Sequence, residues 1–230
     1  MSKNTNISEL INYLSYDGSG NIVPVGTKYT WTIATPNANL TGATDQSVSQ
    51  SIISQTLTNT SITPQSISYS VTPITSNNCL GDPFSINVTV NPTPQIATVT
   101  TPVICSDQTL SFTPVNVTNG IIPAGTTYTW TVVPNANVTG ESDITSPQSS
   151  IGLSQTLRNT TTTLQTVVYN VTPISSLNCS GAIFTLNVPV NPRPYIDNKS
   201  YAICSNTAFT FIPVGGDKIP TGTTYSWTVA

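Results

Sequence analysis

The stretch "GTTYTW" at residues 125–130 decides the fold, because the chain contains it three times. Near copies occur as "GTKYTW" at 26–31 and "GTTYSW" at 222–227, and the three copies hold all three tryptophans of the chain. Within each copy aromatic residues alternate with threonine or a similar small residue, which is the period-two pattern of a β-strand with one buried face. A buried strand that occurs three times predicts that the unit around it also occurs three times.

The similarity extends well beyond the tryptophan. Downstream, "PNANLTGATD" at 36–45 matches "PNANVTGESD" at 134–143, and "YSVTPITSNNC" at 69–79 matches "YNVTPISSLNC" at 169–179. Trp31 and Trp130 are 99 positions apart in the sequence. Helical and leucine-rich solenoids repeat at about 20 to 50 residues, so this period is the length of one small domain instead.

We therefore divide the chain into module one at 1–94, module two at 95–194, and the start of module three at 195–230. Module one is atypical at its beginning, because Asn6 takes the position that Cys105 and Cys204 hold in the later copies. Trp227 corresponds to Trp31, so the last segment repeats a part that module one already has. This correspondence argues against an exchange of strands between chains.

Four strands can be counted in module two. Tyr128, Trp130 and Val132 share one face of the first, and three further strands carry alternating apolar residues at 110–112, 167–171 and 184–190. Short strands separated by Pro, Gly and Asn predict an all-β fold of tandem, immunoglobulin-like antiparallel sandwiches. In this fold Tyr128 and the tryptophans at 31, 130 and 227 fill the cores of their modules. The alternative is a surface platform of Tyr128 and Trp130 that stacks on sugars.

Composition excludes several functions. Only 7% of the residues are charged, the chain has no histidine, and six Lys plus Arg face nine Asp plus Glu. A chain so poor in basic residues cannot neutralise nucleic-acid phosphates. General acid–base catalysis usually needs histidine, which is missing, or a pair of tuned carboxylates, which is nearly missing. No stretch has the roughly 20 apolar residues of a membrane helix. We expect no enzyme activity, no cofactor, no nucleic-acid partner and no insertion into a membrane.

The four cysteines predict disulfides and an oxidising, extracellular location. One pairing joins Cys105 to Cys179 inside module two. The alternative joins Cys79 to Cys105 and Cys179 to Cys204 across the junctions, and spacing does not decide between them. A metal site is not expected, since there is neither histidine nor a CxxC pair.

Two further features concern the loops and the junctions. Asp45 and Asp143, the latter near Glu141, follow the repeated "TG" dipeptide and either bind Ca²⁺ or cap a turn by accepting backbone hydrogen bonds. The junctions "VNPTP" at 90–94 and "VNPRP" at 190–194 each contain two prolines, which restrict the backbone. The junctions should therefore be short and semi-rigid.

The motifs of module two together resemble the PKD-like, immunoglobulin-like repeats of very long surface proteins of gliding and related Bacteroidota. The resemblance is carried by "VICSDQTLSFTP", "IIPAGTTYTW", "VTGESD", "SQTLRNT" and "VVYNVTPISSLNCSGAIFTLNVPVNPRP". It implies export by type IX secretion, attachment to the outer surface of the bacterial cell, and a role as a stalk in adhesion or gliding.

The leading hypothesis is thus a structural stalk segment of a cell-surface adhesin. Its partners would be the neighbouring modules of the same long chain and an extracellular polysaccharide or a solid surface. One alternative is a binding module whose loops at 134–150 contact carbohydrate or a surface. The other is a spacer domain of a secreted hydrolase.

Overall fold

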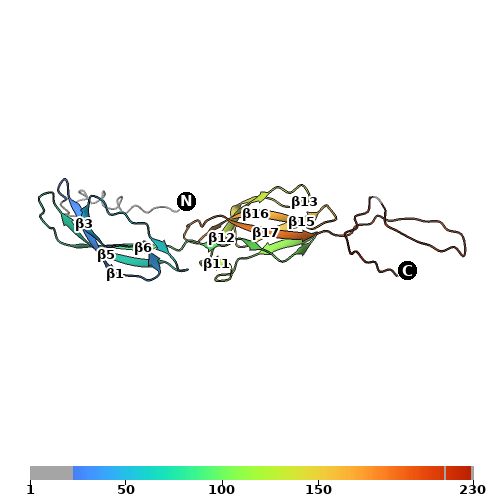
Figure 1. Cartoon of the computed structure of the whole chain (residues 1–230), viewed down its shortest axis with the longest axis horizontal. Coiled ribbons are helices and arrows are strands. Elements are labelled where there is room, and N and C mark those ends of the chain that lie inside the picture. The colour runs from blue at the N-terminus through green and yellow to red at the C-terminus, as the bar shows by residue number, and fades with distance from the viewer. Residues whose placement is uncertain (1–22, 215, 229–230) are drawn as a thin grey trace. The chain divides into compact units, whose positions relative to one another are not determined.

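The computed structural model describes residues 23–214 and 216–228 (Figure 1). All regular structure in these residues is β-strand, so the predicted all-β fold class is confirmed. In the described part of the chain there is no helix of the length and apolarity that a membrane crossing requires. By spatial proximity the chain forms two compact units, and we describe each module by itself.

Module one is built around a four-stranded antiparallel sheet in the order β3-β1-β5-β6. These strands are Gln46–Gln50, Lys28–Thr35, Gln65–Ile74 and Phe84–Val90, in the same order. A short second layer consists of β2 (Leu40–Thr41) paired with β4 (Thr58–Asn59). The side chains of β1 and β5 alternate between the two faces of the sheet. Those on one face point toward the second layer, and together with it they form the core of module one.

Module two has a larger version of the same sheet, in the order β14-β12-β16-β17-β8. The strands are Ile144–Gln148, Thr127–Val133, Gln165–Ile174, Phe184–Asn191 and Val99–Thr100. A further strand, β9 (Ile104–Cys105), also pairs with β17. Both β8 and β9 run parallel to β17, whereas β16 is antiparallel to it.

The second sheet of module two has three strands in the order β10-β15-β13. They comprise Gln108–Phe112, Ile151–Asn159 and Val138–Thr139. A two-stranded pairing joins β7 (Gln95–Ile96) to β11 (Gly120–Ile121). The core between the two larger sheets contains the inward side chains of both, including Leu110, Trp130, Tyr169 and Leu186, each at most 2% exposed. The period-two pattern of the sequence is the reason that these positions share one face.

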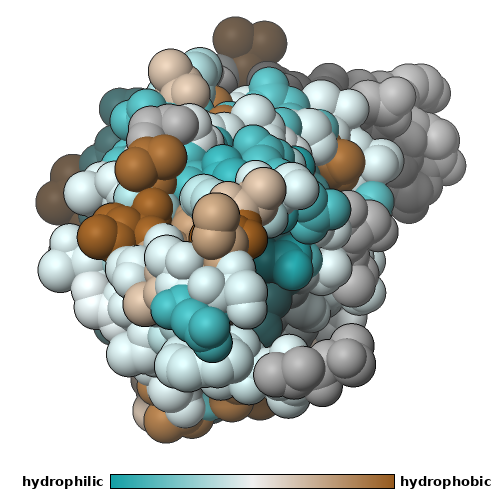
Figure 2. Space-filling view, turned by 90° about the vertical axis from the view of Figure 1, so that its right-hand side faces the viewer, coloured by the Kyte–Doolittle hydropathy of each residue, from teal (hydrophilic) through white to brown (hydrophobic). Residues whose placement is uncertain are grey.

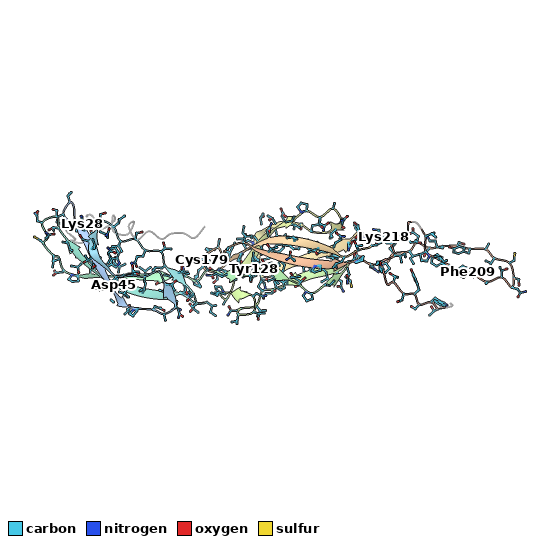
Figure 3. All side chains as sticks on the ribbon, in the orientation of Figure 1. Lys28, Asp45, Tyr128, Cys179, Phe209 and Lys218 are labelled. Carbon is cyan, nitrogen blue, oxygen red and sulfur yellow. The ribbon has the colours of Figure 1, made fainter. Side chains whose placement is uncertain are left out.

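The segment after β17 differs from the two modules. Its described residues contain no strand, and its one ladder contact is the bridge between Tyr195 and Lys218. Large apolar side chains of this segment are exposed, among them Phe209, which Figure 3 labels, and Trp227. Figure 2 views the chain from the side of this segment and shows hydrophobic side chains at the surface. The segment thus carries the sequence of a module start without its sandwich.

Candidate functional site

The repeated aromatic residues of both modules lie in the cores. Trp130 is 2% exposed and Tyr128 1% exposed, and Trp31 in module one is 5% exposed. The sugar-stacking alternative for Tyr128 and Trp130 is therefore wrong, because neither ring has a face open to solvent. Trp227 is 85% exposed, so the structure does not place it in a core. The reason is that no sheet stands opposite it in the described residues.

Each buried tryptophan belongs to a polar network that the sequence analysis did not find. Trp130 Nε1 donates to the Ser142 carbonyl at 3.0 Å, and the Gln155 side-chain amide donates to the same carbonyl at 2.7 Å. Gln155 Oε1 in turn accepts a hydrogen bond from the Tyr169 hydroxyl at 2.8 Å. The network joins two strands of the large sheet to the second sheet and to the loop after β13.

Module one contains the same network at the equivalent positions. Trp31 donates to the Thr44 carbonyl at 3.1 Å, Gln55 donates to that carbonyl at 2.6 Å, and the Tyr69 hydroxyl donates to Gln55 Oε1 at 2.7 Å. The signal in the sequence was the glutamine of the repeated "SQTL", which falls at an inward position of an otherwise apolar pattern. A buried glutamine needs partners for its amide, so this position could have been predicted to pair with a buried donor.

Burial shifts the titration of the tyrosines in the cores. It raises the pKa of Tyr128 to about 12. Burial also raises the pKa of Tyr169, and the nearby charge of Glu141 adds to this effect. Glu141 Oε2 is buried without a hydrogen-bond partner in the structure, while module one has Ala43 at this position. The shared network therefore does not require the glutamate.

A second repeated polar group lies where each module ends. The Asn159 side-chain amide donates to the carbonyls of Thr163 and Val190, both at 2.8 Å, and its Oδ1 accepts from the backbone N–H of Thr161 at 2.8 Å. Asn59 makes the equivalent bonds to Thr63, Val90 and Ser61. Both asparagines are 4% exposed. This amide attaches the loop before the penultimate strand to the last residues of the final strand, directly ahead of the proline-rich junction.

The final strand of module two is also held by the first strands of the module. β8 lies beside Leu186 and Asn187, and β9 lies beside Val190 and Asn191. Two backbone bonds of 2.9 Å extend this pairing, from Thr101 N to the Asn187 carbonyl and from Ser106 N to the Asn191 carbonyl. We call β8 and β9 on β17 the strand clamp. It joins the beginning of the module directly to its end.

A charged contact continues from the strand clamp into the junction. Arg193, in the junction "VNPRP", donates from Nη1 to Asp107 Oδ2 at 3.3 Å, and Arg158 Nε lies 4.0 Å from Asp107 Oδ1. Both arginines are well exposed, and exposed ion pairs contribute about 0 to 1 kcal/mol. The contact therefore contributes little to the stability of the module.

The aspartates of the "TG" loops act as caps. Asp143 Oδ1 accepts from the Val132 backbone N–H at 2.7 Å, and Asp45 Oδ1 accepts from Ile33 N–H at 2.7 Å. No group of three or more potential metal-ligating side chains occurs in the part of the chain that the structure describes. The glycine of the dipeptide has a steric role: Gly140 has φ +95°, and a Cβ there would lie 2.0 Å from the Thr156 carbonyl oxygen. The loop is thus shaped by its packing on β15.

The structure corrects the predicted disulfide within module two. All four cysteines are free thiols. Cys105 lies beside Asn191, the last residue of β17, whereas Cys179 belongs to the turn that precedes Phe184, the first residue of that strand. Seven steps along a strand span about 23 Å. A disulfide requires Cα atoms within about 7 Å, so a bond between Cys105 and Cys179 does not fit this register.

Comparison with known proteins agrees with this geometry. A model of the PKD-like domain matches two segments, residues 10–94 and 102–194, which together make up more than half of the chain. The chain belongs to the PKD-like domain family. Its two PKD-like segments follow one another in the sequence, as the repeat analysis predicted. A search of curated proteins finds no match to the chain. Tandem PKD-like domains are consistent with a structural or spacer module, and such domains are typically non-catalytic.

Proposed function

We propose that this chain is a stalk segment of a bacterial cell-surface adhesin, in which PKD-like modules extend a binding tip from the outer surface for adhesion or gliding. In this proposal the protein is exported by type IX secretion and stays attached to the outer membrane. It has no catalytic activity and uses no cofactor. Its partners are the neighbouring modules, with a polysaccharide or a solid surface at the tip.

The strand clamp of module two is the observation that supports the proposal most directly. Force on a stalk enters a module before its first strand and leaves after its last strand. Because β8 and β9 are parallel to β17, this force pulls the paired strands in opposite directions along their length. All hydrogen bonds of the pairing are then loaded together in shear. An antiparallel pairing of first and last strands would instead open one bond at a time.

The polar contacts at the end of β17 support the same role. Asn159 holds the Val190 carbonyl from inside the module, and the Asn159 backbone N–H donates to Ser106 Oγ at 3.0 Å, next to β9. A side chain buried at 4% exposure keeps these bonds away from competing water. The repeated residues therefore strengthen the place where a stalk would transmit force, whereas a ligand site would be expected to place its polar groups in solvent.

Single-molecule pulling in two directions tests the proposal. In a chain whose four cysteines are replaced by serine, handles attached at Gln95→Cys and Pro194→Cys load the strand clamp in shear. Handles at Gln95→Cys and Ile183→Cys load the same hydrogen bonds from one end of β17, so that the bonds open one after another. Ile183 is exposed, and its replacement should be tolerated. Unfolding of module two is recognised by a release of about 30 nm of chain.

We expect the mean unfolding force to be at least about twofold higher in the first direction, because only there do the ladder bonds share the load. Equal forces in the two directions would remove the mechanical basis of the stalk proposal. A spacer or a binding module would then be the better account of the tandem modules.

A further inference from the structure

The buried glutamine of module two lies against a serine hydroxyl. Gln155 is 5% exposed, and its Nε2 donates to Ser142 Oγ at 3.2 Å as well as to the Ser142 carbonyl at 2.7 Å. The indole of Trp130 donates to the same carbonyl, so two side chains hold the backbone of Ser142 in place. A hydroxyl oxygen and a carboxamide carbon, which can react as nucleophile and electrophile, are thus kept side by side in the module.

The carbonyl of this carboxamide is polarised by a tyrosine. The Tyr169 hydroxyl donates to Gln155 Oε1 at 2.8 Å. Burial and the nearby charge of Glu141 both raise the pKa of Tyr169, so the hydroxyl stays protonated at neutral pH and keeps its hydrogen for this bond. A donor on this oxygen stabilises the negative charge that develops there when a nucleophile adds to the carboxamide carbon.

A carboxylate stands beside the same groups. Glu141 directly precedes Ser142, and its charge acts on the Tyr169 hydroxyl, which binds Gln155. Among the described residues, Glu141 Oε2 is the one buried side-chain oxygen or nitrogen without a hydrogen-bond partner. Burying a carboxylate oxygen without a donor lowers the stability of a protein, so packing does not account for this glutamate.

Module one has the same contacts without the carboxylate. Gln55 Nε2 donates to Thr44 Oγ1 at 2.9 Å, and the Tyr69 hydroxyl donates to Gln55 Oε1 at 2.7 Å. Ala43 takes the position of Glu141. The two modules therefore share a hydroxyl, a carboxamide and a tyrosine, and they differ in the group that can accept a proton.

We propose that module two forms an internal ester between Ser142 Oγ and Gln155 Cδ. Glu141 accepts the hydroxyl proton as Oγ adds to Cδ, and the Tyr169 hydroxyl stabilises the charge on Oε1. The bond from Cδ to Nε2 then breaks, and Glu141 passes the proton to the nitrogen, which leaves as ammonia. The reaction needs no oxidant, reductant or other reactant. It occurs once in a chain, joins the loop after β13 to β15, and does not depend on the stalk proposal.

Mass spectrometry of the 230-residue chain tests the proposal. During incubation of the folded protein at neutral pH, we expect a product that is lighter by one ammonia. Peptide mapping should find the peptides that contain Ser142 and Gln155 joined to each other. Mild alkali hydrolyses esters, and it should release a peptide with glutamate in place of Gln155, because the amide nitrogen has been lost. Thr44 and Gln55 should stay unlinked, since module one lacks the carboxylate.

Two variants separate the roles of the groups. Ser142→Ala removes the nucleophile and should abolish the link. Glu141→Ala should fold, because module one has alanine there, and should form the link at least about a hundredfold more slowly, as is usual on loss of a general base. The stability of this variant is compared with that of unlinked protein, since the ester adds a separate constraint.

Ser146→Ala is the matched control. Ser146 is exposed, and its hydroxyl accepts a hydrogen bond from Gln148 Nε2 at 3.1 Å, so it repeats the contact between a serine and a glutamine outside the core. This variant should form the link at the normal rate, and no link should join residues 146 and 148.

Three results would overturn the proposal. One is a chain that keeps its full mass after prolonged incubation. Another is a loss of ammonia that persists in Ser142→Ala or maps to other residues. The third is a link that forms at the same rate in Glu141→Ala, since the carboxylate would then not be the base.

Discussion

Replacing Asn159 by aspartate should strongly destabilise module two while leaving the shape of the side chain unchanged. The substitution removes the two amide bonds to the carbonyls of Thr163 and Val190 and puts a carboxylate oxygen in their place. Each of the two buried carbonyls left without its donor costs about 1 to 3 kcal/mol. We expect the free energy of unfolding to fall by about 2 to 6 kcal/mol, out of a total of about 5 to 15 kcal/mol for a domain.

Urea unfolding followed by tryptophan fluorescence measures this loss, because Trp130 is buried in the same core. Asn198→Asp is the control for the charge alone, since Asn198 is exposed, and it should change stability by less than about 0.5 kcal/mol. Asn59→Asp makes the equivalent change in module one and should lower the stability of that module instead.

The pH dependence gives this prediction a second signature. Burial, with one oxygen placed against the carbonyls of Thr163 and Val190, should raise the pKa of the new carboxyl in the folded protein above its value in the unfolded chain, about 3.9. The other oxygen still accepts from the Thr161 backbone N–H. The protonated carboxyl is then tolerated best below about pH 4, and stability falls as pH rises through the folded pKa. A destabilisation below 1 kcal/mol at neutral pH, or one that does not depend on pH, would refute the role assigned to Asn159.

The remaining predictions concern the core and its loops, and urea unfolding of module two measures each. Trp130→Ala should cost about 3 to 5 kcal/mol, as for other large aromatic truncations in cores; a loss below 1 kcal/mol would contradict its burial. Gly140→Ala should cost about 2 to 4 kcal/mol, because the added Cβ meets the Thr156 carbonyl at positive φ. Glu141→Ala should increase stability by about 1 kcal/mol by removing a buried oxygen that lacks a partner, and should lower the pKa of Tyr169. Tyr128 ionises from about pH 10 in the unfolded chain but only near pH 12 in the folded protein. The free energy of unfolding should therefore fall by about 1.4 kcal/mol per pH unit between these values, and Tyr128→Phe should reduce this slope.

Much of the fold could be predicted because its signals are local or repeated. The alternation around Trp130 places that ring and Tyr128 on one buried face whatever the neighbouring strand is. Gly125, the repeated glycine shortly before Tyr128, has φ +73°, a conformation that favours glycine. The long period identified the domain-sized unit, which the two PKD-like matches reflect. The domain boundaries at 94 and 194 stay predictions, and so does the cell surface as the place where the protein acts.

The polar site could not be predicted, because its partners are brought together only by the packed sheets. Tyr169 and Gln155 are 14 positions apart, and Asn159 and Val190 are 31 positions apart. Nothing in the period-two pattern says which inward polar side chain meets which carbonyl. The cysteine pairing failed for the same reason, since only the register of β9 on β17 shows that Cys105 and Cys179 belong to opposite ends of that strand.

By itself, then, the sequence determined the strand-forming segments, their buried faces and the repetition of the unit, because alternation and repetition are properties of neighbouring residues. The tertiary structure decided how the strands associate. In module two, "SQTL" at 154–157 is part of β15, whose backbone pairs with β10 on one side and with β13 on the other. Strand structure requires a partner for its backbone groups, and the partner is chosen by contacts far away in the sequence. The parallel clamp on β17 follows from that choice.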